Sequence, residues 1–316
     1  MRLPLWWRTA LLSSCLVAGA APRIQVHGEM GAGGMFPGNT LPAFEYAIDA
    51  GVDAIEMDMQ VTRDNVIVIS HDPILHAPNC TGPKLSAVIH ELTLAEVKQW
   101  DCGGAPSSDA PRRKTVPGTR MPTLDEVFAL APRGKFLFNI ETKITPKRRT
   151  LEEAQALIRS IVPTRLTPED EDRRAAALTL QAPEMTPPPE EFTQLVLEKV
   201  SKYHLESRVI LESFDFRTLL AMKRLEPKVQ RAALCMGPNL DFVKIGQESG
   251  AGIISPLLTF LTAGQVRAAH AAGLTVLPWV ANERADWDRL ISYGVDAILT
   301  DYPADLIGYL KQRGKR

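Results

Sequence analysis

The stretch Gly51-Val-Asp-Ala-Ile-Glu-Met-Asp58 joins a helix stop, a short link and an apolar strand that ends in an acidic residue. The same arrangement returns as Gly294-Val-Asp-Ala-Ile-Leu-Thr-Asp301 near the other end of the chain. A glycine after the last turn of a helix commonly adopts the left-handed conformation that ends it. Because a helix-to-strand joint that occurs twice is typical of a repeated architecture, both stretches predict joints of one α/β fold.

Outward from these joints, short apolar runs rich in β-formers alternate with helical patterns. The predicted strands cover residues 24–27, 54–59, 136–141, 209–213, 230–234, 252–255, 275–280 and 297–300. The predicted helices, in which apolar residues recur about every 3.6 positions, cover residues 41–48, 191–203, 216–225, 262–272 and 285–293. Eight strands with helices between them predict an α/β fold of the TIM (β/α)8 barrel type.

Two segments do not follow this alternation. Residues 72–120 are rich in Pro, Gly and Ser and contain one predicted helix, Leu94–Trp100, so we expect an inserted cap after the second strand, over the barrel mouth. Residues 163–190 are rich in Pro, Glu and Asp, which predicts a mobile surface excursion. Residues 21–316 are therefore expected to form a single barrel domain that carries the cap.

The first twenty residues differ in composition from the rest. Two arginines precede an apolar run over residues 9–18, and the small residues Ala18-Gly19-Ala20 follow. The run is too short to span a bilayer and predicts a signal peptide, residues 1–20, cleaved after Ala20. We therefore expect an exported protein, periplasmic or secreted, without an integral membrane span after cleavage. A lipoprotein site at Leu12-Ser13-Ser14-Cys15 is the competing interpretation.

The net charge narrows the class of binding partner. The formal charge is −1, and cleavage would remove two arginines, giving −3, so the chain offers no broad basic surface for nucleic acid.

In an oxidising compartment, a disulfide between Cys80 and Cys102 would close a loop of about 23 residues and contribute about 3 kcal/mol to folding stability. Two unpaired thiols are the alternative. Cys235 lies in an apolar run and is expected to be a buried core thiol.

The predicted strand over residues 54–59 carries Glu56 and Asp58 on one face, because side chains two apart share a face. Two carboxylates in one space repel each other unless they share a cation or a proton. Arg63-Asp64-Asn65 is a turn signal, and residues 66–70 then run back along the strand. Pairing residue 62 with 66 sets 58 opposite 70, so His71 should return beside the carboxylates.

The predicted strand over residues 136–141 ends in Glu141, and Lys143 follows on the same face. Acidic donors from neighbouring strand ends suit a hard divalent metal such as Mg²⁺ or Ca²⁺, and Lys143 would face phosphate charge beside it. Each of these residues alone is compatible with an ordinary surface pair. Together they lie where barrel enzymes keep their sites, at the C-terminal ends of strands, and predict a metal site at the mouth.

An ordered set of motifs resembles the glycerophosphodiester phosphodiesterase family over residues 24–310. It consists of Pro37-x-Asn39-Thr40-Leu-Pro-Ala-Phe44, Glu56-x-Asp58, Val61-Thr62-x-Asp64, His71-Asp72, Glu141-x-Lys143, Ser213-Phe214-Asp215, Trp279-x-x-Asn282 and Thr300-Asp301-x-Pro303. The resemblance implies a TIM barrel with an inserted cap. It also implies a small-molecule glycerophosphodiester substrate, hydrolysed to sn-glycerol 3-phosphate and an alcohol.

The resemblance assigns roles to particular positions. It implies metal ligands at Glu56, Asp58 and Glu141, a catalytic histidine at His71 and a substrate-contacting lysine at Lys143. Trp279 would line the mouth against the glycerol or the head group, although a core tryptophan is an equal interpretation.

The loop before Asn39 departs from the family pattern. Counted back from Pro37, Glu29 stands where the family has a catalytic histidine, Met30 where it has an arginine that binds phosphate, and Gly38 where it has a glutamate. His27, two residues earlier on the same strand face, aligns with that histidine only through a two-residue insertion. The expected acid-base set is therefore His71 with Glu29 or His27.

Three hypotheses follow from this departure. The first is an active phosphodiesterase with a rearranged acid-base set. The second is a catalytically impaired relative, natural or engineered, that keeps the barrel and binds metal or a phospho-ligand without efficient turnover. The third is sugar hydrolysis by Glu56 and Glu141 as paired carboxylates, which leaves His71 and Lys143 without a role.

Overall fold

The computed structural model describes residues 23–104, 110–144 and 185–316. The predicted signal peptide, residues 1–20, and most of the predicted excursion, 163–190, lie outside the described residues. In the part of the chain that is described, no helix is both long enough and apolar enough to cross a membrane.

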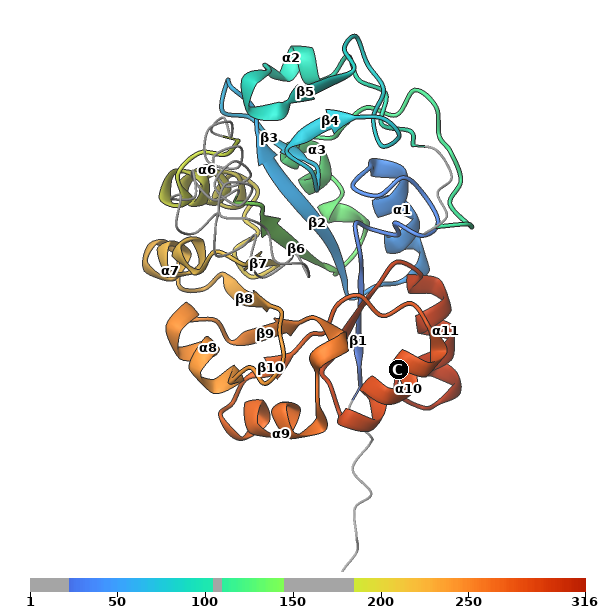
Figure 1. The fold of residues 1–316 in the computed structure, drawn as a ribbon, viewed down its shortest axis with the longest axis vertical. Helices are drawn as coiled ribbons and strands as arrows, with labels where there is room; N and C mark the ends of the chain where they lie inside the picture. The colour runs from blue at the N-terminus through green and yellow to red at the C-terminus, as the bar shows by residue number, and fades with distance from the viewer. Residues whose placement is uncertain (1–22, 105–109, 145–184) are drawn as a thin grey trace, which may run out of the picture.

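Eight parallel strands of the described chain form the barrel wall. They are β1 (Gln25–Gly28), β2 (Ala54–Val61), β6 (Leu137–Thr142), β7 (Val209–Ser213), β8 (Gln230–Cys235), β9 (Ile253–Pro256), β10 (Thr275–Val276) and β11 (Ala297–Thr300). Their order around the sheet is β10-β9-β8-β7-β6-β2-β1-β11 (Figure 1). Leu299 N donates to Pro278 O at 3.1 Å, and Ala281 N donates to Leu299 O at 2.9 Å. These hydrogen bonds join β11 to the segment that follows β10. The predicted eight-stranded barrel is confirmed, with β10 shorter than expected.

Helices lie around the outside of the strands (Figure 1). They are α1 (Leu41–Ala50), α6 (Pro189–Lys202), α7 (Phe216–Leu225), α8 (Phe242–Ser249), α9 (Ala263–Ala271), α10 (Arg284–Tyr293) and α11 (Pro303–Gln312). Shorter elements are α3 (Leu124–Phe128) and the 3-10 turns η1 (Ile89–Glu91), η2 (Ala131–Arg133) and η3 (Leu258–Phe260). The five helices predicted between the strands are all present, whereas α3, α8 and α11 were not predicted from the sequence.

The two glycines of the repeated joint end α1 and α10. Gly51 and Gly294 have φ angles of 87° and 78°, in the left-handed region that glycine adopts without strain. Each glycine N–H donates back to carbonyls of the last helical turn, as expected for a helix C-cap. The sequence repeat is therefore a structural repeat.

The aspartate two residues after each glycine forms hydrogen bonds to the neighbouring strand. The carboxylate of Asp53 accepts a hydrogen bond from Val26 N at 2.8 Å, and Asp53 N donates to Val26 O at 2.9 Å. Asp296 repeats this with Val276, at 2.7 and 3.2 Å. The shared Gly-Val-Asp sequence thus fixes where a strand starts relative to its neighbour.

Past the barrel rim, β2 turns back as a hairpin. Strand β3 (Ile67–Ile69) pairs antiparallel with β2, with Met59 opposite Ile69. Ser70 N donates to Asp58 O at 2.9 Å, so residue 58 does lie opposite residue 70. This return places His71 next to the end of the carboxylate strand, as predicted.

The inserted segment forms a cap with its own core. It contains the antiparallel strands β4 (Ile74–His76) and β5 (Ser86–Val88) and the helix α2 (Leu94–Val97), which ends before the predicted Trp100. Trp100 is buried in a second hydrophobic cluster, separate from the barrel core. Cys80 and Cys102 form a disulfide within this cluster, and Cys235 is a buried free thiol, as predicted.

Replacing both Cys80 and Cys102 by Ser should lower the free energy of unfolding of the cap by about 3 kcal/mol, since the disulfide closes a loop of about 23 residues. Urea unfolding followed by tryptophan fluorescence, to which the buried Trp100 of the cap contributes, measures this change. A reducing agent should produce the same change in the wild type and none in the double variant. Equal stability of oxidised and reduced wild type would contradict the prediction.

Candidate metal and substrate site

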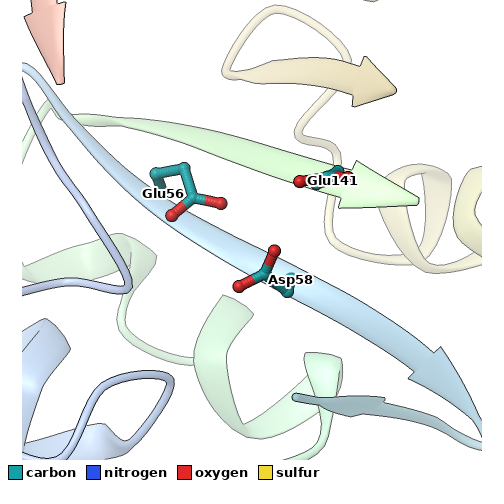
Figure 2. Close-up of side chains that lie close together, drawn as sticks. All are labelled: Glu56, Asp58 and Glu141. Atoms are coloured by element: carbon teal, nitrogen blue, oxygen red, sulfur yellow. The ribbon is translucent and has the colours of Figure 1, made fainter. Parts of the chain in front are cut away.

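Three carboxylates from two neighbouring strands lie close together. Glu56 and Asp58 belong to β2, and Glu141 pairs in parallel register with Asp58 from β6 (Figure 2). All three are buried, and each offers an oxygen within 4.8 Å of the others. Burial, followed by the charge of neighbouring carboxylates, raises the pKa of both Glu56 and Glu141 well above the usual range. This donor set fits a hard divalent cation.

The loop before α1 holds two of these carboxylates in place. Asn39 Nδ2 donates to Asp58 Oδ2 at 2.7 Å, and Asp58 N donates to Asn39 Oδ1 at 3.1 Å. Met30 N donates to Glu56 Oε2 at 2.8 Å. Asn39 has a φ of 59°, a left-handed conformation that asparagine adopts more readily than most residues. Asn39 therefore holds the acidic site directly.

Lys143 and His71 lie beside the carboxylates. Lys143 Nζ lies 3.5 Å from Asp58 Oδ1 and 3.2 Å from Glu141 Oε1. Burial opposes its charge, but these carboxylates outweigh burial and raise the pKa of Lys143. His71 Nδ1 lies 2.8 Å from Asp72 Oδ1, and this hydrogen bond raises the pKa of the His71 side chain. His71 thus uses Nδ1, and not Nε2, for this hydrogen bond.

Glu29 shares one cavity with this group. A cavity of about 310 Å³ at the mouth is lined by Glu29, Glu56, Asp58, His71, Glu141, Lys143, Glu212, Phe214, Leu234, Met236, Trp279 and Leu299. Glu29 N donates to Thr300 O at 2.9 Å, which continues the pairing of β1 with β11. Burial and the nearby carboxylates of Asp58 and Asp301 raise the pKa of Glu29 well above its usual range.

His27 is placed differently from Glu29. It is buried, with Nε2 3.4 Å from Gln25 Oε1 and with Nδ1 lacking a hydrogen-bond partner among the described residues. It does not line the mouth cavity. Burial lowers the pKa of His27 to about 4, although the charge of Asp53 acts in the opposite direction. His27 is therefore a neutral histidine inside the barrel.

Met30 and Gly38 also depart from the family pattern in the first loop, which joins β1 to α1, and these two residues contact each other. Met30 has a φ of 47°, and its side chain lies over Gly38. A Cβ built on Gly38 would lie 2.9 Å from both Cβ and Sδ of Met30. A larger residue at position 38 therefore requires the Met30 side chain to move.

Glu212 is a site residue that the sequence analysis missed. It is buried on β7 and lines the mouth cavity. Burial raises the pKa of Glu212 to about 7, against hydrogen bonds from Asn139 Nδ2 at 2.6 Å and from Ser255 Oγ at 3.4 Å. The available signal was a glutamate inside the otherwise apolar run Val209-Ile-Leu-Glu-Ser213.

One part of the mouth lining is largely apolar. Trp279 lines the cavity while its Nε1 donates to Ser255 O at 2.8 Å. The Phe214 ring meets the Trp279 ring edge to face, with centroids 5.8 Å apart. Met236 and Phe214 are 58% and 42% exposed, so this wall is open to solvent. Of the two interpretations of Trp279, the structure favours the mouth.

Known proteins with similar sequences come from one family. Residues 30–186 and 168–305 match the model of the glycerophosphoryl diester phosphodiesterase family. A glycerophosphodiester phosphodiesterase of Caldanaerobacter subterraneus is 27% identical over 88% of this chain and 94% of its own length. A lysophospholipase D of Homo sapiens is 25% identical over 92% of this chain and 86% of its own length.

A solved structure from Silicibacter pomeroyi, described as a candidate glycerophosphoryl diester phosphodiesterase, has the same fold. It superposes with a TM-score of 0.76 and 27% identity, covering 93% of this chain and 95% of the other.

The neutral state of buried His27 generates a pH prediction. Between pH 6.5 and about 4 the unfolded chain binds a proton at this histidine and the folded chain does not, so the free energy of unfolding should fall as the pH falls through this window. The loss due to His27 is about 3 kcal/mol at pH 4. Unfolding of wild type and His27→Leu by urea at several pH values measures it. Parallel pH curves for the two proteins would contradict the prediction.

Proposed function

Because this chain belongs to the glycerophosphoryl diester phosphodiesterase family of enzymes, we propose that it hydrolyses glycerophosphodiesters to sn-glycerol 3-phosphate and an alcohol. The observation that carries the proposal is the convergence of Glu56, Asp58 and Glu141 within 4.8 Å of one another at the barrel mouth. Lys143 and His71 line the same cavity as these carboxylates, so the groups that bind and protonate a phosphodiester lie together.

The acidic group would hold a divalent cation, Mg²⁺ or Ca²⁺. Oxygen donors of this kind suit either ion. When bound, the cation supplies positive charge that stabilises the phosphate oxygens during hydrolysis. Lys143, with Nζ 3.2 Å from Glu141, adds a second positive charge on the same side of the cavity.

His71 and Glu29 form the proposed acid-base pair. A water molecule attacks phosphorus and forms the new phosphorus–oxygen bond as it gives a proton to Glu29, and the phosphorus–oxygen bond to the alcohol breaks as His71 protonates the leaving oxygen. Asp72 orients His71 through its Nδ1 contact at 2.8 Å. We favour Glu29 over His27 because Glu29 lines the cavity and His27 does not.

We also propose that the protein is exported, with residues 1–20 as the signal peptide. The Cys80–Cys102 disulfide supports this proposal, because such bonds form and persist in oxidising compartments. The mature protein would then act on soluble glycerophosphodiesters outside the cytoplasm.

Turnover of glycerophosphocholine should require a divalent cation and His71. His71→Ala should lower kcat by about 10²- to 10⁴-fold, since it removes a general acid. Chelation should abolish turnover, and Mg²⁺ or Ca²⁺ should restore it and raise the melting temperature. Enzyme-coupled release of sn-glycerol 3-phosphate measures the rate, and differential scanning fluorimetry measures the thermal shift.

The matched control is His204→Asn. His204 is exposed and has a φ of 55°, a conformation that asparagine also adopts, so the fold and the rate should not change. Absence of metal-dependent turnover above the His71→Ala background would sink the proposal of an active enzyme.

A catalytically impaired relative is the second candidate, favoured by Glu29 and Met30 in the first loop. If it holds, Glu29→His, Met30→Arg and Gly38→Glu together should raise kcat/KM for glycerophosphocholine by at least about 10²-fold. Gly38→Glu alone should destabilise the loop, because Met30 occupies the space beside Gly38. Steady-state kinetics of the single, double and triple variants measure the difference. An unchanged rate in a folded triple variant refutes this candidate.

A further inference from the structure

A second cavity lies between the first loop and the cap. Its volume is about 240 Å³, and its lining includes Met30, Gly38, His71, His76 and Arg113. His71 also lines the mouth cavity, so the two cavities meet at this histidine. The second cavity is smaller than the roughly 300–1,000 Å³ of pockets that hold drug-sized ligands, so it suits a small group.

Two residues of the first loop, Met30 and Gly38, give this cavity an apolar patch. Gly38 has no side chain, and the Met30 side chain packs over it and lines the cavity. Neither residue can pair with an anion. Any strong positive charge must therefore come from the cap.

Arg113 provides that charge. It extends from the cap, and its Nε donates to Gly33 O at 2.6 Å, which fixes the guanidinium against the first loop. Among the described residues, its terminal nitrogens make no hydrogen bond or ion pair. A guanidinium held at one nitrogen still presents a fork of donors that fits a carboxylate or a phosphate.

No other ionisable group that lines the cavity pairs with Arg113, although the buried carboxylate of Asp301, outside the lining, is near enough for the charge of Arg113 to act on its pKa. Asp72 is occupied by His71, with Nδ1 and Oδ1 2.8 Å apart. His76 Nδ1 lies 2.7 Å from Ala77 O. Lys143, in contrast, lines the mouth cavity and lies beside the metal-binding carboxylates. Lys143 thus lines the mouth cavity, and Arg113 lines the second cavity.

We propose that the second cavity is the subsite for the leaving alcohol and that Arg113 binds an anionic group on that alcohol. The inference rests on the proposed phosphodiesterase function. The phosphodiester then lies beside Lys143 at the mouth, His71 protonates the leaving oxygen at the junction, and the rest of the alcohol extends toward Arg113. Arg113 is a specificity-determining residue in this arrangement.

Two substrates that differ by one carboxylate test the assignment. Glycerophosphoserine carries a carboxylate on the alcohol, and glycerophosphoethanolamine is the same molecule without it. The wild type should prefer glycerophosphoserine. Arg113→Met should lower kcat/KM for glycerophosphoserine by about 10- to 100-fold, mainly through KM, and change that for glycerophosphoethanolamine by less than about threefold. Arg113→Lys, which keeps the charge, should retain part of the preference.

Arg112→Met is the matched control. Arg112 is the neighbouring cap residue, pairs with Asp305 at 2.5 Å and does not line the cavity. Its replacement should leave the ratio between the two substrates unchanged. Equal losses for both substrates in Arg113→Met, or a changed ratio in Arg112→Met, would overturn the assignment.

A binding measurement separates this inference from the proposed turnover. Calorimetric titration of the metal-loaded protein with each substrate, under conditions without turnover, should show tighter binding of glycerophosphoserine, lost in Arg113→Met. If the wild type binds with this preference but does not hydrolyse either substrate, the proposed function fails and the subsite stands. If Arg113→Met binds both substrates as the wild type does, the subsite fails whatever the rates.

Discussion

Repulsion among the buried carboxylates of Glu56, Asp58 and Glu141 is the constraint on which the barrel mouth depends. Their oxygens lie within 4.8 Å of one another, so the surrounding structure must hold them together before any cation arrives. Parallel pairing of β2 with β6 fixes the strand positions, and the first loop adds the Met30 and Asn39 hydrogen bonds. Because these contacts use backbone groups and a side-chain amide, they survive changes in the residues that meet the substrate.

The parts of the site that the sequence predicted follow from local periodicity. Side chains two apart on a strand share a face, which placed Glu56 with Asp58 and Glu141 with Lys143. The turn at Arg63-Asp64-Asn65 set the hairpin register, so the position of His71 could be worked out from pairing alone. The strands themselves were visible because a parallel barrel strand is a short apolar run bounded by helical patterns.

The parts that the sequence did not predict depend on tertiary packing. Glu212 looked like an interruption of an apolar run, because only barrel closure shows that it faces the mouth. Arg113 belongs to a cap loop without periodicity, and its contact with Gly33 joins residues 80 positions apart. Helix α8 spans only Phe242–Ser249, about two turns, which is too short for a clear helical pattern. The packing of Met30 on Gly38 likewise depends on how the loop folds back.

The cap has its own hydrophobic cluster and its own cross-link, Cys80–Cys102, and it enters the chain between β3 and α3. A segment that is stabilised internally can diverge in sequence or length without disturbing the strands that carry the carboxylates. Selection can then act on the cap and on the barrel as two separate modules. In this arrangement new alcohol preferences would arise by changes confined to residues 72–120, while the strands that carry the carboxylates stay the same.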